Sequence, residues 1–292
     1  MMDELIAPLR GGQVRAPWEG ACRKKPWQYR VTAAIPVLGT PEVLDVCIET
    51  LRSQTEPPFI VVIDTGSAAD ELERIESFRA EDVEVHSLRL NGVIHPSDFP
   101  AMAMDLAFTL CRTEFIFATH ADVFARRRDF LADMVEWCRT VSPVVGYQIS
   151  PRTHEDWRGM VSHTATMYHM PTMDRIGFGW SQRRLCHMAG IADYRPSRDR
   201  QNWPDTELLG NYILRQWGIA PYLIGDERNF ERHVDENIDH CRSLTSGRLY
   251  SPEYFDRART WADKAMNEAR QRIERWKKSS GSSAPATPVQ AS

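Results

Sequence analysis

Hydrophobic residues in the first half of the chain follow two alternating patterns. Short, almost uninterrupted apolar runs predict buried strands at residues 30–37, 59–63 and 115–118, and we expect a further strand at residues 83–88. Between these runs, apolar residues recur at helical spacing over residues 41–52, 69–80 and 99–110. Such an alternation of strand and helix is typical of a parallel sheet with right-handed crossovers. The pattern therefore predicts an α/β fold.

The second half of the chain is less regular. We expect a helix over residues 128–141, strands at 144–150 and 162–169, a glycine-rich turn at 176–180, a helix over 206–216 and a short strand at 220–224. Thr40, before Pro41, is expected to be the N-cap of the first helix, and Gly218 is expected to stop the helix that ends near Gln216. A long apolar stripe over residues 252–278 predicts one further helix.

These elements divide the chain into five regions. Residues 1–28 contain Gly, Pro and Arg without a clear period, and we expect an irregular N-terminal arm. Residues 29–143 form the regular half of one domain, and residues 144–250 form its second half, which is richer in Trp, His and Arg. The C-terminal helix occupies residues 251–278. Residues 279–292 are rich in Ser, Ala and Pro and are expected to be disordered.

Composition narrows the possible functional classes. The net charge of −4 provides no overall basic field that would recruit nucleic acid or an anionic membrane. The six cysteines are scattered without a C-x-x-C pair, which favours buried free thiols and a reducing compartment. The N-terminus lacks the apolar core of a signal peptide, and no stretch approaches the roughly 18 apolar residues of a membrane span. We therefore expect a cytoplasmic protein.

Polar side chains follow two of the predicted strands directly. His120, Ala121 and Asp122 come after the fourth strand, and Asp64 ends the second. In open α/β sheets, ligands bind at the carboxyl ends of such strands. Simpler structural roles are also open, because Asp122 could cap a following helix and Asp64 could form a turn before Gly66.

Five short segments resemble motifs of the GT-A-fold glycosyltransferases, in particular the large inverting family that uses nucleotide-sugar donors. In chain order they are Ile35-Pro36, Val62-Ile63-Asp64-Thr65-Gly66-Ser67, Ala103-Met104-Asp105-Leu106-Ala107, the strand from Phe115 to Asp122, and Ile176-Gly177-Phe178. They are similar, in the same order, to Ile-Pro, Val-Asp-Asp-Gly-Ser, Ala-Arg-Asn-x-Gly, Tyr-Ile-x-Phe-Leu-Asp-x-Asp and Ile-Gly-Gly-Phe. The resemblance covers roughly residues 30–240. It implies a GT-A, Rossmann-like fold whose mixed, mainly parallel sheet is flanked by helices.

The resemblance also implies a reaction, in which a sugar moves with inversion from a UDP- or GDP-sugar type donor to an acceptor hydroxyl. It assigns donor contacts to Pro36, Asp64, Asp105, His120, Ala121 and Asp122. It further implies a divalent metal, Mn²⁺ or Mg²⁺, held by Asp122, His120 and His233, with His240 as a weaker substitute for His233. His120 stands where the family usually has the first Asp of Asp-x-Asp. Its lower negative charge reduces the expected hold on a hard cation.

Inversion needs a carboxylate that removes the proton of the acceptor hydroxyl. The segment Trp203-Pro204-Asp205-Thr206-Glu207 resembles the Glu-Asp motif of the family, which makes Asp205 the first candidate for this base and Glu207 the second. Both residues also suit an ordinary helix start, Asp205 as N-cap and Glu207 as a first-turn acid. Trp180, beside Gly179, and Trp203 are candidates for contact with an acceptor sugar.

Two other functions remain open. The departure at His120 is compatible with a catalytically inactive nucleotide-sugar-binding or scaffold protein of the same fold. A nucleotidyltransferase would usually have a Gly-rich loop with Lys or Arg after the first strand, whereas Leu38-Gly39-Thr40-Pro41 has neither. The acceptor is open between a glycan, a lipid-linked sugar, a protein and a modified nucleic-acid base.

Overall fold

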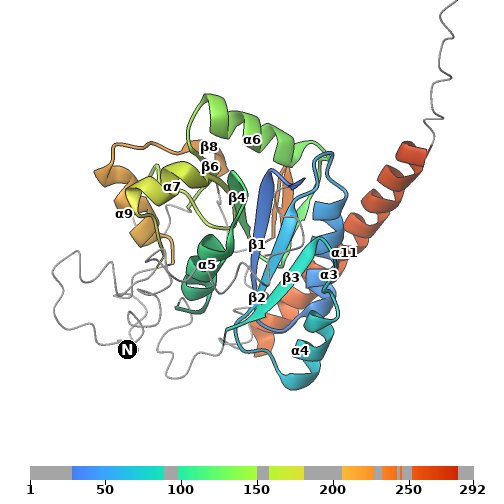
Figure 1. Ribbon diagram of the computed structural model, residues 1–292. Coiled ribbons are helices and arrows are strands. Elements are labelled where there is room, and N and C mark those ends of the chain that lie inside the picture. Colours follow the sequence, from blue (N-terminus) through green and yellow to red (C-terminus); the bar gives the residue numbers. More distant parts are fainter. Residues whose placement is uncertain are drawn as a thin grey trace, which may run out of the picture.

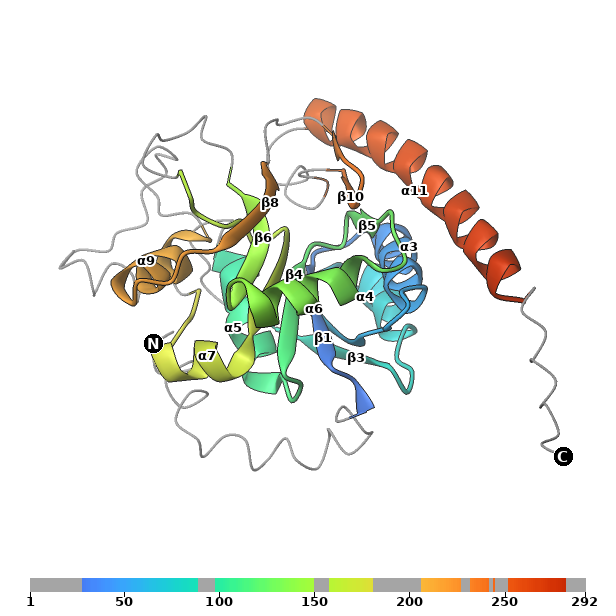
Figure 2. The same ribbon diagram turned by 90° about the horizontal axis from the view of Figure 1, so that it is seen from above.

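The computed structural model describes residues 28–88, 98–149, 158–180, 206–226, 232–241, 244 and 252–281. In these ranges a seven-stranded sheet forms the centre of the molecule, and a separate three-stranded sheet accompanies it. Helices cover both faces of the large sheet (Figures 1 and 2). The predicted fold class, a mixed and mainly parallel α/β sheet flanked by helices with a C-terminal helix, is confirmed. The predicted arm up to residue 27 and the tail after residue 281 lie outside the described residues.

The first half of the large sheet forms as the hydrophobic pattern predicts. In chain order it comprises β1 (Val31–Val37), α3 (Pro41–Arg52), β2 (Phe59–Asp64), α4 (Ala69–Glu76), β3 (Val83–Ser87), α5 (Asp98–Leu110) and β4 (Phe115–Thr119). The neighbouring pairs β3–β2, β2–β1 and β1–β4 are all parallel. Helix α4 is shorter than predicted, because the backbone leaves the helix after Glu76 and forms a bridge between Ala80 and Val83.

The second half of the large sheet mixes strand directions. Its elements are α6 (Phe130–Thr140), β6 (Val144–Gln148), β7 (Ala165–His169), α7 (Met170–Ile176), α9 (Leu208–Gln216) and β8 (Tyr222–Asp226). β7 is antiparallel to both β4 and β6, and β8 is parallel to β6, so the strand order is β3-β2-β1-β4-β7-β6-β8. The pattern did not predict α7. This helix ends at Gly177, whose φ of 63° suits a left-handed cap.

The small sheet is antiparallel and comprises β5 (Val123–Ala125), β9 (His233–Val234) and β10 (Ile238–His240), with β10 in the middle. The sequence predicted none of these strands, because two or three residues are too few for a periodic signal. They position residues from three distant parts of the chain against one another.

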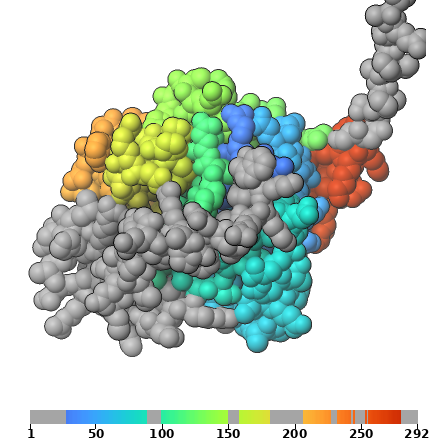
Figure 3. Space-filling view, viewed as in Figure 1, coloured from blue at the N-terminus to red at the C-terminus, as the bar shows by residue number. Residues whose placement is uncertain are grey.

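Helix α11 (Pro252–Gly281) packs against α3 and β5 through a stripe of alanines. It continues past the predicted end at residue 278, so residues 279–281 are helical where disorder was expected. Its last turns extend beyond the sheets (Figure 2), and in the space-filling view α11 lies beside α3 at one side of the molecule (Figure 3). Neither α11 nor any other helix in the described ranges is long and apolar enough to cross a membrane.

Two apolar clusters hold the layers together, one on each face of the large sheet. On one face, Leu44 of α3 and Phe117 of β4 belong to a core that also includes α6 and α11. On the other face, Met104 of α5 and Leu209 of α9 belong to a core that also includes α7. The strands between them are buried from both sides, which explains why they appear in the sequence as continuous apolar runs.

The turn after β1 differs from its prediction. Thr40 is the N-cap residue of α3, as predicted, but its φ of 55° lies in the left-handed region and its hydroxyl makes no capping hydrogen bond. The Thr40 carbonyl instead accepts hydrogen bonds from the N–H groups of Val43 and Leu44. The turn is fixed from outside, since the Ser67 hydroxyl accepts a hydrogen bond from the Gly39 N–H at 2.6 Å. This tertiary contact overrides the local capping preference.

Candidate functional site

The carboxyl ends of β1, β2 and β4 meet at one edge of the large sheet. Asp64, at the end of β2, is fully buried, and its carboxylate accepts hydrogen bonds from the N–H groups of Gly66 at 3.3 Å and Ser67 at 3.0 Å and from the Ser67 hydroxyl. Asp64 therefore builds the turn after β2. Pro36 lies on the adjacent strand β1 and is partly exposed at this edge.

Asp122 follows β4 and is tied to the end of β10. Its Oδ2 accepts a hydrogen bond from the Leu244 N–H at 3.3 Å, and its backbone carbonyl accepts one from the Cys241 N–H at 3.0 Å. Asp122 is only 2% exposed, and the preceding Ala121 is buried in the core. These contacts hold the Asp122 carboxylate where the large sheet meets the small one.

His120, Asp122 and His240 bring three potential ligand atoms within 4.8 Å of one another. Asp122 Oδ1 lies 3.9 Å from His120 Nδ1 and 3.6 Å from His240 Nε2. Atoms that bind one ion at about 2.0–2.2 Å stand about 3.0–3.5 Å apart, so small side-chain shifts would complete the geometry. Two imidazoles make Mg²⁺, which prefers oxygen ligands, a poorer match than a transition metal. The cluster is a candidate metal site.

A chain of hydrogen bonds runs from His120 into the interior. His120 Nε2 bonds to Nε2 of His163, and Nδ1 of His163 bonds to the Glu207 carboxylate. Burial would raise the pKa of Glu207, but the charge and hydrogen bond of His163, together with backbone hydrogen bonds, outweigh it and lower the pKa. Glu207 is therefore an ionised carboxylate that orients His163, which in turn orients His120.

Asn211 explains how Glu207 comes to face His163. Its side-chain amide donates to the carbonyls of Val161 at 2.8 Å and Glu207 at 2.9 Å, and its Oδ1 accepts from the Val161 N–H at 2.9 Å. These bonds fasten the first turn of α9 to the segment just before His163. The position of the Glu207 carboxylate therefore depends on how α9 packs against the segment before His163.

Trp180 lies inside an aromatic cluster. It is 1% exposed and packs edge-on against Phe108, Tyr168 and Phe178. Contrary to the prediction, the ring offers no open face to an acceptor sugar, and the neighbouring Gly179 is buried as well. Asp105, predicted to contact the donor, is 3% exposed and accepts a hydrogen bond from the Trp180 N–H at 3.0 Å. Both residues anchor the segment after α7.

His233, predicted as a metal ligand, is not part of the three-residue cluster. It lies on β9 opposite His240, its ring packs edge-on against Tyr147, and its Nε2 is 3.4 Å from Asp235 Oδ2. Burial raises the pKa of Asp235, but hydrogen bonds from His233 and Tyr147 and from the backbone lower it to about 2. The third residue of the metal cluster is His240, which was predicted as a weaker substitute for His233.

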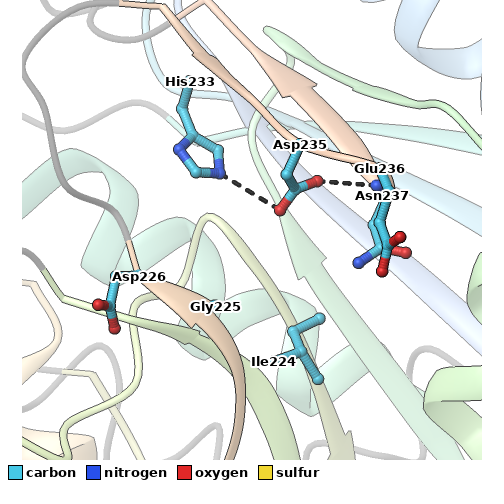
Figure 4. Close-up of a pocket in the computed structure, with 7 residues that line it drawn as sticks. All are labelled: Ile224, Gly225, Asp226, His233, Asp235, Glu236 and Asn237. Carbon is cyan, nitrogen blue, oxygen red and sulfur yellow. Dashed lines mark hydrogen bonds and ion pairs between the residues drawn. The ribbon is translucent and has the colours of Figure 1, made fainter.

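The same histidine lines a pocket of about 490 Å³ at the end of β8. Figure 4 shows the lining residues, which are Ile224, Gly225, Asp226, His233, Asp235, Glu236 and Asn237. β8 is parallel to β6, which runs in the direction of β4 across the antiparallel β7. The pocket therefore opens at the same edge of the large sheet as the metal cluster.

Two predicted residues, Asp205 and Trp203, lie outside the described residues. Conversely, His163 belongs to the site although the sequence did not single it out. The available signal was a histidine at the site-facing end of the predicted strand 162–169. Its partner could not be inferred, because the contact arises from the antiparallel register of β4 and β7, in which Thr119 pairs with Ala165.

No protein-family model and no curated protein matches the sequence. Similar solved structures include the mannosyltransferase PcManGT from Pyrobaculum calidifontis in complex with GDP-Man and Mn²⁺, at 13% identity over 98% of this chain and 88% of that chain, with a TM-score of 0.48. Another is S. aureus TarS 1–349 in complex with UDP-GlcNAc, at 13% identity, 85% and 71% coverage, and a TM-score of 0.47. Glucosyl-3-phosphoglycerate synthase from Mycobacterium tuberculosis in complex with phosphoglyceric acid has 10% identity, 73% and 76% coverage, and a TM-score of 0.45. All three TM-scores are below 0.5, so these likenesses carry no argument about function.

Proposed function

We propose that this protein is a GT-A-type glycosyltransferase that uses a nucleotide-sugar donor and a divalent metal ion. The observation that supports it best is the cluster formed by His120 and Asp122, which follow β4, and His240 of β10. This is the edge of the sheet where ligands bind in open α/β folds. Pro36 and Asp64 stand at the ends of the two neighbouring strands, where a nucleotide would lie across the sheet.

The residues present fit a divalent cation. One carboxylate and two imidazoles converge, and His120 has the buried partner, through His163 and Glu207, that metal-bound histidines usually have. A bound ion would supply positive charge against the leaving nucleoside diphosphate. We expect Mn²⁺ to serve better than Mg²⁺, because two of the three ligands are nitrogen.

We assign the general base to Asp205 and a positioning role to Glu207. A general base must lie within hydrogen-bond reach of the proton that it removes. Glu207 is 8% exposed and already bonded to His163, so it is poorly placed to meet an acceptor. Asp205 precedes it in the approach to α9. Attack by the deprotonated hydroxyl on the anomeric carbon, opposite the diphosphate, would invert its configuration.

We place the acceptor in the pocket at the end of β8, on the same edge as the metal cluster. The carboxylates of Asp226, Asp235 and Glu236 line it, and carboxylates are good acceptors for the hydroxyl groups of sugars. This placement replaces the one predicted at Trp180. A cytoplasmic location remains our expectation, in keeping with the four buried free cysteines of the described ranges.

Calorimetric titration with UDP, GDP and their sugar derivatives tests the donor and the metal together. We expect one nucleotide to bind only when Mn²⁺ is present, and we expect Asp122→Asn to abolish this binding, while the exposed Asp70→Asn binds the nucleotide as the wild type does. Equal nucleotide binding by the wild type and Asp122→Asn would refute the metal site. Metal-dependent binding without donor hydrolysis or transfer to any acceptor would instead indicate a nucleotide-sugar-binding protein without catalysis.

A further inference from the structure

Helix α11 places a buried arginine, Arg272, against the small sheet. Arg272 is 9% exposed, and its Nε donates to the Ala125 carbonyl of β5 at 3.2 Å. Its guanidinium carbon lies 5.8 Å from the centre of the Trp276 ring. Its Nη2 is buried and has no hydrogen-bond partner in the part of the chain that the structure describes. One edge of this buried guanidinium group is therefore left without an acceptor.

The surroundings of Arg272 have an excess of positive charge. The charged side chains that influence it are Arg126, Asp239, Arg275 and Glu268. Both carboxylates are already bound by another arginine, Arg232. Four arginines and two carboxylates leave two positive charges unbalanced. Burial and the charge of Arg126 accordingly lower the pKa of Arg272 to about 10.

This arginine cluster is separate from the metal cluster. Successive residues of a strand point to opposite faces of the sheet. On β10, His240 belongs to the metal cluster, whereas the preceding Asp239 is fully buried against Arg232, which also binds Glu268 of α11. The arginines thus lie on the face of the small sheet that is turned towards α11.

We propose that Arg126, Arg272 and Arg275 form an anion site for a phosphate group. A phosphate dianion would balance the two excess charges and offer an acceptor oxygen to Nη2 of Arg272. The planar fork of a guanidinium group matches the geometry of phosphate oxygens. A buried cation beside a second cation is unfavourable without such a counterion. The phosphate could be inorganic or the monoester headgroup of a lipid.

Calorimetric titration of the full chain with inorganic phosphate tests the site. EDTA removes metal, and chloride keeps the ionic strength constant, so that general salt effects are equal throughout. We expect saturable binding, which Arg272→Gln weakens at least tenfold. The partly exposed Arg126→Gln should do the same with little risk to folding. The matched control, Arg257→Gln, changes an exposed arginine on the same helix and should bind as the wild type does.

Asp122→Asn separates this site from the proposed donor site, and we expect it to keep phosphate binding intact. Co-sedimentation with phosphatidic acid vesicles, compared with phosphatidylcholine vesicles, distinguishes the lipid source from the free one. Binding of either phosphate source that Arg272→Gln and Arg126→Gln weaken, and Arg257→Gln does not, supports the proposal. The absence of binding to both sources, or an equal loss in all three variants, overturns it.

Discussion

Replacing Glu207 tests the hydrogen-bonded chain that orients His120. Glu207 and His163 are 8% and 6% exposed and bond to each other. Glu207→Ala removes one half of this buried pair and leaves Nδ1 of His163 without its acceptor, which should cost about 3–5 kcal/mol in free energy of unfolding. Glu207→Gln keeps the size and one acceptor oxygen. It exchanges a charge-assisted bond for a neutral one and should cost about 1–2 kcal/mol.

Urea denaturation at several pH values measures both costs. The pKa of Glu207 in the folded protein is lowered from 4.5, so its ionised form stabilises the fold above that pH. This contribution is lost as the pH falls through the folded pKa. The difference in unfolding free energy between the wild type and Glu207→Gln should therefore shrink in acid.

The exposed Glu81→Ala provides the control and should change the unfolding free energy by less than about 0.5 kcal/mol. An equal cost for Glu207→Ala and Glu81→Ala would refute the buried pair, as would a difference for Glu207→Gln that is independent of pH. Calorimetric titration with Mn²⁺ tests the same hydrogen-bonded chain in a second way. If Glu207 acts through His163 on His120, Glu207→Gln should weaken Mn²⁺ binding by about 10–100-fold.

Three further substitutions test separate features. Gly210→Ala should lower the free energy of unfolding by about 1–3 kcal/mol, because the new Cβ would stand 2.4 Å from Phe178 Cζ; an unchanged urea midpoint would contradict this close approach. Thr40→Gly should raise the same quantity by about 1 kcal/mol, because it relieves a φ of 55° in a β-branched residue; a loss of stability would argue against strain there. His240→Ala should weaken Mn²⁺ binding at least about tenfold in calorimetry, and His233→Ala should not; the reverse order would restore His233 as the ligand.

The large sheet could be predicted because its signals are local. β2 is buried along its whole length, and its residues form one apolar run that ends at a polar turn. The alternation of such runs with helical patterns then fixes the order of the elements. Where a local rule failed, a distant residue was responsible. Thr40 is the N-cap of α3, yet Ser67 holds the preceding Gly39, and Thr40 adopts a left-handed backbone conformation without a capping hydrogen bond from its side chain.

The candidate site was only partly predictable for the same reason. His120 and Asp122 stand next to a strand that the sequence identifies. His163 joins them only through the antiparallel pairing of β7, which periodicity does not reveal. The sequence could not show whether His240 or His233 belongs to the metal cluster, because the directions of the two side chains depend on a hairpin of very short strands. Trp180 was a candidate for contact with an acceptor sugar, whereas its ring packs against Phe108 of α5 and Tyr168 of β7.

The contacts of Asp122 have a consequence for how the site assembles. Its carboxylate is held by the backbone of Leu244, 122 residues further along the chain, while all seven strands of the large sheet are complete by Asp226. The sheet can therefore form before the metal site exists. An ion bound by both Asp122 and His240 would close the long chain segment between these two residues. Its binding energy would also stabilise the packing of the β9–β10 hairpin against the large sheet. The apparent metal affinity of this protein would thus report how completely the late part of its chain has folded.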